Sequence, residues 1–250
     1  MRVLIIAAAL LSFSAPVLAK APPAHATKPA PRPIALPADV APEPNKDWAN
    51  IARYRGANAV LMAEPASADR VVFMGDSITQ LWVDQPYLKG SKTFVGRGIA
   101  GQTASQMVLR FRGDVIDLKP AVVHIMAGTN DVAQNNGPES LEEIEGYIVS
   151  MVELAQANRI KVVLASIPPA SEFAWHKGLE PAPKIAVINQ WLKAYAARLG
   201  LPYADYWAVL ATPEGAMKPE YSADGVHPNA AGYDAMRPVA EAAIAAALQR

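Results

Sequence analysis

The chain has 250 residues, which is enough for one domain with a sizeable hydrophobic core. Its 23 Lys and Arg residues balance 23 Asp and Glu residues, so it lacks the basic excess that proteins use to bind nucleic acid or anionic lipid. Cysteine is absent, which excludes disulfides, a thiol nucleophile, cysteine-based zinc sites and a lipidated N-terminal cysteine. These properties favour a small neutral substrate over a nucleic acid.

The N-terminus carries the pattern of a secretory signal peptide. A basic residue, Arg2, precedes the apolar run 3–11, and small residues follow up to Ala19. The apolar run is shorter than the roughly 20 residues that a transmembrane helix needs. We expect a signal peptide over residues 1–19, with cleavage after Ala19 or, as an alternative, after Ala26. The mature chain is then exported to the periplasm or secreted if the source is bacterial, and it has no transmembrane segment.

Residues 20–45 are rich in proline, with eight of the 22 prolines of the chain falling between Ala21 and Pro44. Such a composition favours extended backbone and cannot build a core. We expect a disordered linker here, followed by one domain over residues 46–250. The sequence does not indicate an oligomeric state.

Apolar runs alternate with amphipathic segments through the rest of the chain. The runs that predict buried strands, the second of them weaker, cover residues 71–74, 92–95, 121–126, 160–167 and 201–204. Periodicities typical of helices cover residues 47–61, 103–112, 140–152, 185–200 and 229–248. Pro238 predicts that the last helix is kinked or that its first turn is separate. This alternation predicts a parallel sheet covered by helices on both faces, a three-layer α/β/α sandwich.

Polar motifs stand directly after three of these strands and before the final helix. They read Gly75-Asp76-Ser77, Gly98-Ile99-Ala100-Gly101-Gln102-Thr103, Gly128-Thr129-Asn130-Asp131 and Asp224-Gly225-Val226-His227-Pro228-Asn229. Each motif alone is typical of a turn, a loop or a helix start. Because ligands of open α/β sheets bind beyond the carboxyl ends of the strands, we expect the four motifs to meet at one rim.

These residue types are the ones that acyl transfer requires. Ser77 becomes a nucleophile when a base takes its proton, His227 can be that base, and Asp224 can hold the imidazole ring. The backbone amides of Ser77 and Gly101 and the side chain of Asn130 can stabilise the oxyanion of a tetrahedral intermediate. The other three histidines lie in the linker, inside a strand and in an irregular segment: His25, His124 and His176.

Two rival site types fit the sequence less well. The α/β-hydrolase elbow requires G-x-S-x-G, but Thr79 stands where the second glycine would be. A two-metal phosphoesterase needs several histidine and carboxylate ligands, and the rim offers only Asp76, Asp131, Asp224 and His227. We therefore expect no metal and no other cofactor.

The four blocks GDSI, GIAGQT, GTND and DGVHPN together resemble the SGNH subgroup of the GDSL lipase/esterase family, and the resemblance covers nearly the whole chain after residue 46. It implies that Ser77 is the nucleophile of a catalytic triad completed by Asp224 and His227. It also implies an oxyanion hole made by Ser77, Gly101 and Asn130.

The same resemblance implies a flavodoxin-like sheet of five parallel strands and catalysis without a metal. The chain departs from the family's name-giving motif only at Ile78, where the motif has leucine. This conservative change does not alter the implied chemistry.

The resemblance implies the type of bond but not the substrate. We predict an exported serine esterase that removes a short, acetyl-like acyl group from a carbohydrate or another polar alcohol, with Trp82, Phe173 and Trp175 as candidate substrate contacts. Ordinary packing of these aromatic side chains is the alternative. Three other activities stay open: a lysophospholipase or thioesterase, an acyltransferase, and a non-catalytic domain that binds carbohydrate or cell wall.

Overall fold

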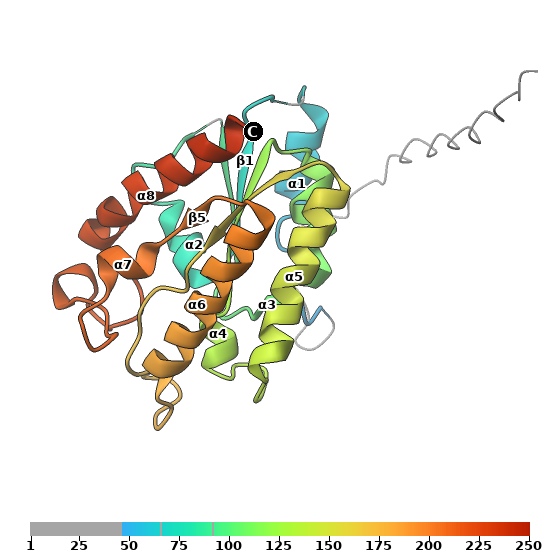
Figure 1. Cartoon of the computed structure of the whole chain (residues 1–250). Helices are drawn as coiled ribbons and strands as arrows, with labels where there is room; N and C mark the ends of the chain where they lie inside the picture. The colour runs from blue at the N-terminus through green and yellow to red at the C-terminus, as the bar shows by residue number, and fades with distance from the viewer. Residues whose placement is uncertain (1–46, 66, 92) are drawn as a thin grey trace, which may run out of the picture. The chain divides into compact units, whose positions relative to one another are not determined.

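Five parallel strands form the centre of the fold (Figure 1). The computed structural model describes residues 47–65, 67–91 and 93–250, so the expected signal peptide and linker lie outside the described residues. The strands are β1 (Val71–Gly75), β2 (Phe94–Gly98), β3 (Val122–Met126), β4 (Lys161–Ala165) and β5 (Tyr203–Ala204). Their order, β2-β1-β3-β4-β5, is that of flavodoxin-like sheets, which confirms the predicted fold.

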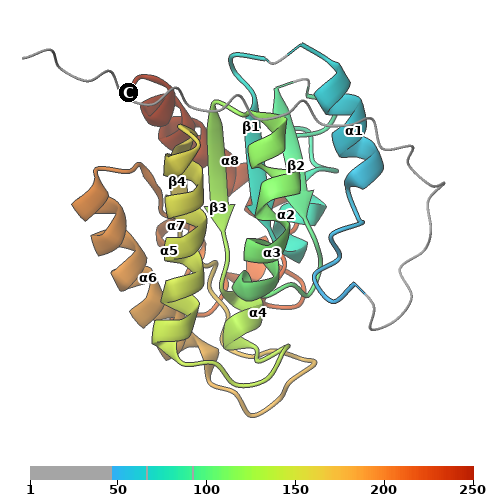
Figure 2. The same ribbon diagram turned by 90° about the vertical axis from the view of Figure 1, so that its right-hand side faces the viewer.

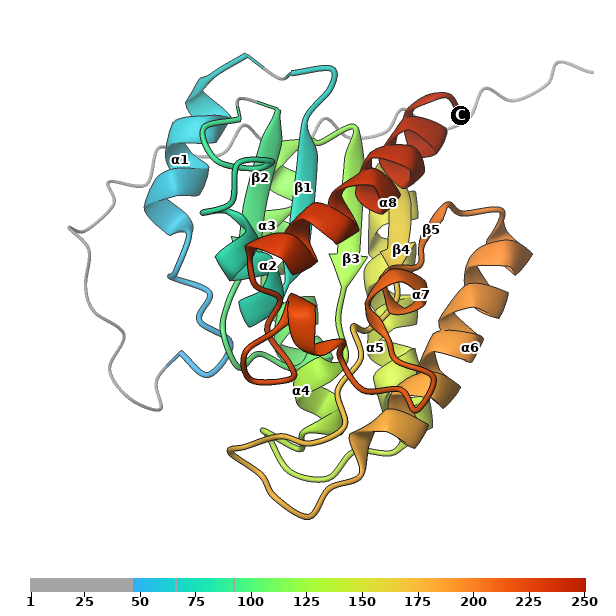
Figure 3. The same cartoon turned by 90° about the vertical axis from the view of Figure 1, so that its left-hand side faces the viewer.

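Helices cover both faces of the sheet. One face carries α3 (Ala104–Asp114), α5 (Leu141–Ala157) and α6 (Pro181–Leu199). In Figure 2, α3 and α5 lie in front of the strands and α6 stands to their left. The other face carries α2 (Ser77–Trp82), α7 (Tyr206–Leu210) and α8 (Ala230–Leu248), seen in front in Figure 3. The remaining helical segments are α1 (Arg55–Ala63), η1 (Ile116–Leu118), α4 (Thr129–Val132) and η2 (Pro219–Tyr221). None of the described helices is long and apolar enough to cross a membrane.

The side chains of β1 show why its sequence is apolar throughout. Val72 and Met74 pack into the core under α3 and α5, whereas Val71 and Phe73 pack into the core under α8. A strand that is buried on both faces reads as a continuous apolar run. The same burial applies to β3, so both strands end at the rim surrounded by packed side chains.

Local signals explain most helix starts. Glu143 and Ser140 exchange the two hydrogen bonds of a capping box at the start of α5. The predicted first helix is the main difference, because Asp47 caps a short series of turns through the N–H groups of Ile51 and Ala52 before α1 begins at Arg55. Pro238 lies inside α8, which continues through it as one helix.

Candidate active site

Ser77 is the first residue of α2, directly beyond the carboxyl end of β1. Asp76 caps this helix, since its Oδ1 accepts a 2.9 Å hydrogen bond from the Ile78 N–H. Gly75 is required for the tight strand-to-helix junction, because an added Cβ would meet the Thr79 side chain and lie 2.9 Å from the Met126 carbonyl oxygen. The Asp-Ser pair therefore starts a helix and exposes the serine at the rim.

Ser77 lies beside a histidine that follows 150 positions later in the sequence. Its Oγ is 2.9 Å from His227 Nε2, and His227 Nδ1 is 2.7 Å from Asp224 Oδ2. A carboxylate only accepts hydrogen bonds, so Nδ1 carries the proton and Nε2 is free to accept the proton of the serine hydroxyl. The structure thus brings together the three residues that the sequence nominated as a triad.

The Asp224–His227 turn is held by its own backbone. Asp224 Oδ1 accepts hydrogen bonds from the Val226 and His227 N–H groups at 2.9 and 2.8 Å, and from the Ser222 hydroxyl at 3.0 Å. Partial burial raises the pKa of Asp224, but the hydrogen bonds from His227 and Val226 outweigh it and hold the pKa well below its usual range. Asp224 is therefore an ionised partner for the imidazole at neutral pH.

A contact on the far side of the same loop fixes α8 against α2. The Tyr233 hydroxyl, in the first turn of α8, donates a 2.7 Å hydrogen bond to the Ile78 carbonyl oxygen. Both side chains are buried. The helix that carries Ser77 and the segment that carries His227 are thus joined directly.

The predicted oxyanion donors also converge on this rim. Within the part of the chain that the structure describes, the N–H groups of Ser77 and Gly101 donate no hydrogen bond, which leaves both free for a ligand oxygen. Asn130 Nδ2 lies 3.3 Å from Asp76 Oδ2 and 3.1 Å from the Gln102 carbonyl oxygen. Gly101 has a φ of +77°, a conformation that favours glycine.

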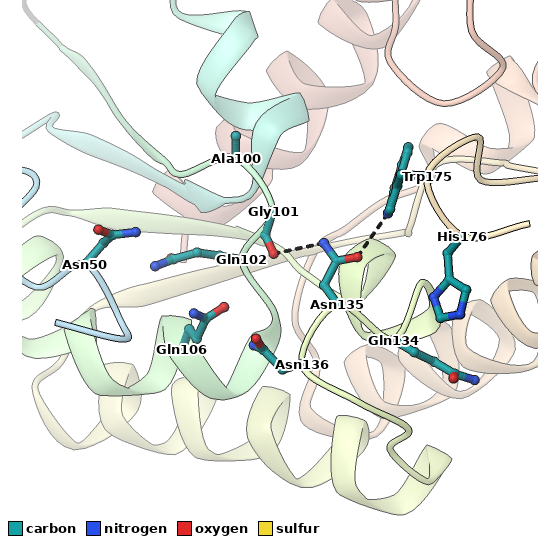
Figure 4. A pocket seen from close by; sticks show the side chains of 10 residues that line it. All are labelled: Asn50, Ala100, Gly101, Gln102, Gln106, Gln134, Asn135, Asn136, Trp175 and His176. Atoms are coloured by element: carbon teal, nitrogen blue, oxygen red, sulfur yellow. Dashed lines mark hydrogen bonds between the residues drawn. The ribbon is translucent and has the colours of Figure 1, made fainter. Parts of the chain in front are cut away.

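Two supporting residues were not singled out by the sequence. Asn135 Nδ2 donates to Asn130 Oδ1 at 2.8 Å. It also donates to the Gly101 carbonyl oxygen at 3.1 Å (Figure 4). Asp76, considered before only as a turn residue or metal ligand, accepts from Asn130 on the other side. Burial raises the pKa of Asp76 to about 6, although hydrogen bonds from Ile78 and Thr129 and the nearby His227 oppose the rise.

The three aromatic candidates for substrate contact do not share one environment. Trp82 and Phe173 are fully buried, so the expectation that they contact a substrate is wrong for both. Trp82 packs edge-on to Phe73 in the core beneath α8, at a centroid distance of 5.7 Å. Trp175 is 49% exposed and its ring centroid lies 6.3 Å from that of His227, which leaves it as the candidate.

The carboxylates considered as metal ligands each bind a nearby donor instead. Asp76 caps α2, Asp224 binds His227, and both oxygens of Asp131 accept from the Ala104 N–H at the start of α3. Among the described residues, no group of three or more His, Asp or Glu side chains is arranged to hold a metal ion.

Comparison with known proteins identifies the family. The pattern of the GDSL-like Lipase/Acylhydrolase family matches residues 73–235, which include every residue of the site described above. The chain belongs to this family. GDSL-like lipases and acylhydrolases are serine hydrolases that act on ester bonds, and this agrees with the resemblance seen in the sequence.

Solved GDSL-like structures are similar over nearly their whole length. A GDSL-like lipase from Bacteroides thetaiotaomicron is 44% identical with a TM-score of 0.76, and the match covers 80% of this chain and 98% of that one. A candidate acylhydrolase from Bacteroides fragilis is 47% identical with a TM-score of 0.77, covering 81% and 99%. An acetylxylan esterase, Axe2 from Geobacillus stearothermophilus, is 21% identical with a TM-score of 0.56, covering 72% and 95%, and this shows the fold alone.

A curated relative matches over a shorter stretch. The lipoprotein YqeF of Bacillus subtilis is 28% identical over 149 residues, which are 51% of this chain and 61% of that protein. The chain therefore spans about three fifths of the length of this relative.

Proposed function

We propose that this GDSL-like protein is an exported serine esterase that hydrolyses short-chain, acetyl-like carboxylic esters. The observation that carries the proposal is the continuous hydrogen-bonded series from Ser77 Oγ to His227 Nε2 and from His227 Nδ1 to Asp224 Oδ2, at 2.9 and 2.7 Å. Each distance is within the range in which a base can take a proton from a nucleophile and be oriented by a third group.

In this mechanism His227 Nε2 takes the hydroxyl proton while Ser77 Oγ bonds to the ester carbon, whose carbonyl electron pair moves to the oxygen. The resulting oxyanion accepts hydrogen bonds from the N–H groups of Ser77 and Gly101. It also accepts one from Asn130 Nδ2, which gives up its 3.3 Å contact with Asp76 or its 3.1 Å contact with Gln102 to make it. Each such donor typically contributes about 10²–10³-fold to the rate.

Collapse of the intermediate breaks the carbon–oxygen bond of the alcohol, which leaves with the proton from His227 Nε2. Water then attacks the acyl-Ser77 ester, giving its proton to Nε2. The second collapse releases the carboxylic acid and returns the proton to Ser77 Oγ. Asp224 stays ionised throughout and stabilises the imidazolium.

Two further features support the finer parts of the proposal. The N-terminal pattern is that of a secretory signal, and YqeF, a relative, is called a lipoprotein, which agrees with export. Axe2, which has the same fold, is an acetylxylan esterase. An acetyl group is small enough to need only the immediate surroundings of Ser77.

A fluorophosphonate probe tests the nucleophile. Intact-mass and peptide mass spectrometry should find one adduct on Ser77, absent from Ser77→Ala, and that variant should lose ester turnover. Ser150→Ala, a control at a partly exposed serine on α5, should keep both. Unchanged turnover by Ser77→Ala would contradict the serine-esterase proposal.

Profiling of p-nitrophenyl esters tests the acyl length. We expect the highest kcat/KM for the acetyl ester, with a steady fall toward longer chains. A maximum at an eight-carbon acyl chain or longer would instead indicate a lysophospholipase or thioesterase. Acylated acceptor forming faster than free acid would indicate an acyltransferase, and absence of any adduct would favour a non-catalytic binding domain.

A further inference from the structure

A cavity of about 450 Å³ borders the oxyanion side of the site (Figure 4). Gly101 forms part of its wall, so the cavity begins at one of the proposed oxyanion donors. Its other walls come from separate parts of the chain: the turn at Asn50, the start of α3, the loop after α4 and the segment with Trp175 and His176. The volume is in the range of small-molecule binding sites.

The chemistry of the lining is unusual for a lipid site. Side-chain amides dominate it, and none of the described residues that line it is Asp, Glu, Lys or Arg. An amide both donates and accepts hydrogen bonds, as does the hydroxyl group of an alcohol. Such a wall matches a neutral ligand with many hydroxyls. It offers neither an apolar groove for a long acyl chain nor a charge for an ionic headgroup.

Several of these polar groups have no partner among the described residues. The side chains of Asn50 and Gln134 make no hydrogen bond there, and Asn136 uses only its Nδ2, which donates to Thr103 Oγ1 at 2.8 Å. His176 Nδ1 lies 2.8 Å from the Ala133 carbonyl oxygen, so Nδ1 carries the proton and Nε2 of the neutral ring is an acceptor.

Trp175 adds a flat apolar surface at the same cavity. Its Nε1 donates a 3.0 Å hydrogen bond to Asn135 Oδ1, and Phe173 packs against its ring at a centroid distance of 5.0 Å. The indole is thus held in place although it is 49% exposed. A fixed aromatic ring beside polar groups suits a ligand that has an apolar face and a polar edge.

We infer that this cavity binds the alcohol portion of the ester and that this alcohol is a neutral, polyhydroxylated ring of the sugar type. The inference rests on the proposed function. The leaving alcohol must receive a proton from His227 Nε2, so it lies on the His227 side of the ester carbon. Trp175 forms part of the cavity wall and its ring centroid lies 6.3 Å from that of His227, so the cavity extends to that side. The sugar ring then covers Trp175, and its hydroxyls meet the amides of Gln134 and Asn136.

Three acetyl esters with the same acyl group and different alcohols test this assignment. The substrates are a monoacetylated methyl glycoside, ethyl acetate and acetylcholine. We expect the kcat/KM for the glycoside ester to exceed the other two by at least about tenfold, mainly through a lower KM. Gln134→Ala should lower the ratio of kcat/KM for the glycoside ester to kcat/KM for ethyl acetate by about fivefold, which is the effect of losing one hydrogen bond. Gln156→Ala, at an exposed glutamine near the end of α5, should leave the ratio unchanged.

A binding measurement separates this inference from the proposed function. Saturation-transfer NMR with Ser77→Ala and the unesterified methyl glycoside should detect binding. The signal should weaken in Ser77→Ala/Trp175→Ala and in Ser77→Ala/Gln134→Ala. Ser77-dependent hydrolysis of ethyl acetate without preference for the glycoside ester, or with preference for acetylcholine, overturns the sugar assignment and leaves the esterase intact. Glycoside binding without any ester turnover keeps the cavity assignment and overturns the esterase.

Discussion

Asn135 holds the side chain of Asn130 from the solvent side, with a 2.8 Å hydrogen bond from Asn135 Nδ2 to Asn130 Oδ1. The same Nδ2 reaches the Gly101 carbonyl oxygen at 3.1 Å, so one exposed amide touches two of the three residues proposed as oxyanion donors. Because its Oδ1 is occupied by Trp175 Nε1, the amide cannot flip without losing bonds. Asn135 is thus a positioning residue.

Asn135→Ala should lower kcat by about 10–10²-fold, less than the loss of a donor itself, because Asn130 keeps its contacts to Asp76 and Gln102. KM for p-nitrophenyl acetate should change little, since the ground-state ester does not need the oxyanion donors. Steady-state kinetics measure both constants. Asn158→Ala, a control at the end of α5, should match the wild type, and a wild-type kcat for Asn135→Ala would show that Asn130 is held without it.

Gly101→Ala tests the backbone conformation at the oxyanion hole. Among the described residues, the only atom within 4 Å of an added Cβ is Asn135 Nδ2 at 3.8 Å, so space is available. The φ of +77°, however, costs an alanine about 1–2 kcal/mol. We expect urea unfolding to show the same loss of unfolding free energy. We also expect kcat to fall by about 10–10²-fold, because the N–H group of residue 101 turns away from the oxyanion.

Gly90 supplies the matched control. Its φ is +70°, and an added Cβ meets no atom of the described residues within 4 Å, so Gly90→Ala carries the same backbone cost away from the site. This variant should lose similar stability while keeping wild-type kcat. Equal activity losses in both variants would attribute the effect to stability alone.

Asp76 makes the stability of the protein depend on pH. Burial raises its pKa from 3.8 to about 6, so the unfolded chain ionises more readily than the folded one. Its favourable contribution is present below about pH 4 and is lost as the pH rises through about 6, by up to about 3 kcal/mol. Asp76→Asn removes this titration.

Urea unfolding of wild type and Asp76→Asn between pH 4 and pH 8 checks this prediction. The free energy of unfolding of the variant, relative to wild type, should rise by about 2.4 kcal/mol across that range, since part of the full effect of about 3 kcal/mol lies below pH 4. Because the comparison uses the slope with pH, a constant cost from the altered contact with Asn130 cancels. A difference that does not vary with pH would contradict the raised pKa.

Alanine substitutions of Trp82 and Trp175 should have different effects, the first mainly on stability and the second mainly on substrate preference. Trp82→Ala removes a fully buried ring that packs against Phe73 and Tyr233, and it should cost about 3–5 kcal/mol of unfolding free energy. Trp175→Ala should cost about 1 kcal/mol or less, because the ring is half exposed, yet it should reduce the preference for a glycoside ester. The reverse order of stability losses would contradict the burial of Trp82.

The sequence predicted those parts of the candidate site that lie just after a strand or just before a helix. Ser77, Gly101 and Asn130 could be placed because parallel strands bring their carboxyl ends to one edge, whatever the details of packing. The Asp224–His227 pair could be placed because three residues span one turn. In each case the local sequence pattern and the strand topology are sufficient to predict where the residue lies.

The remaining features depend on packing that one sequence does not display. Asn135 lies in a polar loop typical of any turn, and only the fold brings it against Asn130 and Trp175. Trp82 ends α2 and Trp175 lies in an irregular segment, but neither neighbourhood in the sequence shows that α8 covers the first ring and leaves the second exposed. The first helix begins at Arg55, later than predicted, because Asp47 caps turns with the same short-range hydrogen bonds that start helices.

The hydrogen bond from Tyr233 to Ile78 joins segments 155 positions apart, and the Ser77–His227 pair joins segments 150 positions apart. Both contacts form only when α8 docks on α2. A growing or truncated chain that lacks residues beyond β5 therefore holds the proposed nucleophile and the proposed oxyanion loop but lacks the proposed base. If His227 acts as proposed, ester hydrolysis begins only once the C-terminal helix has docked, and its onset reports completion of the fold.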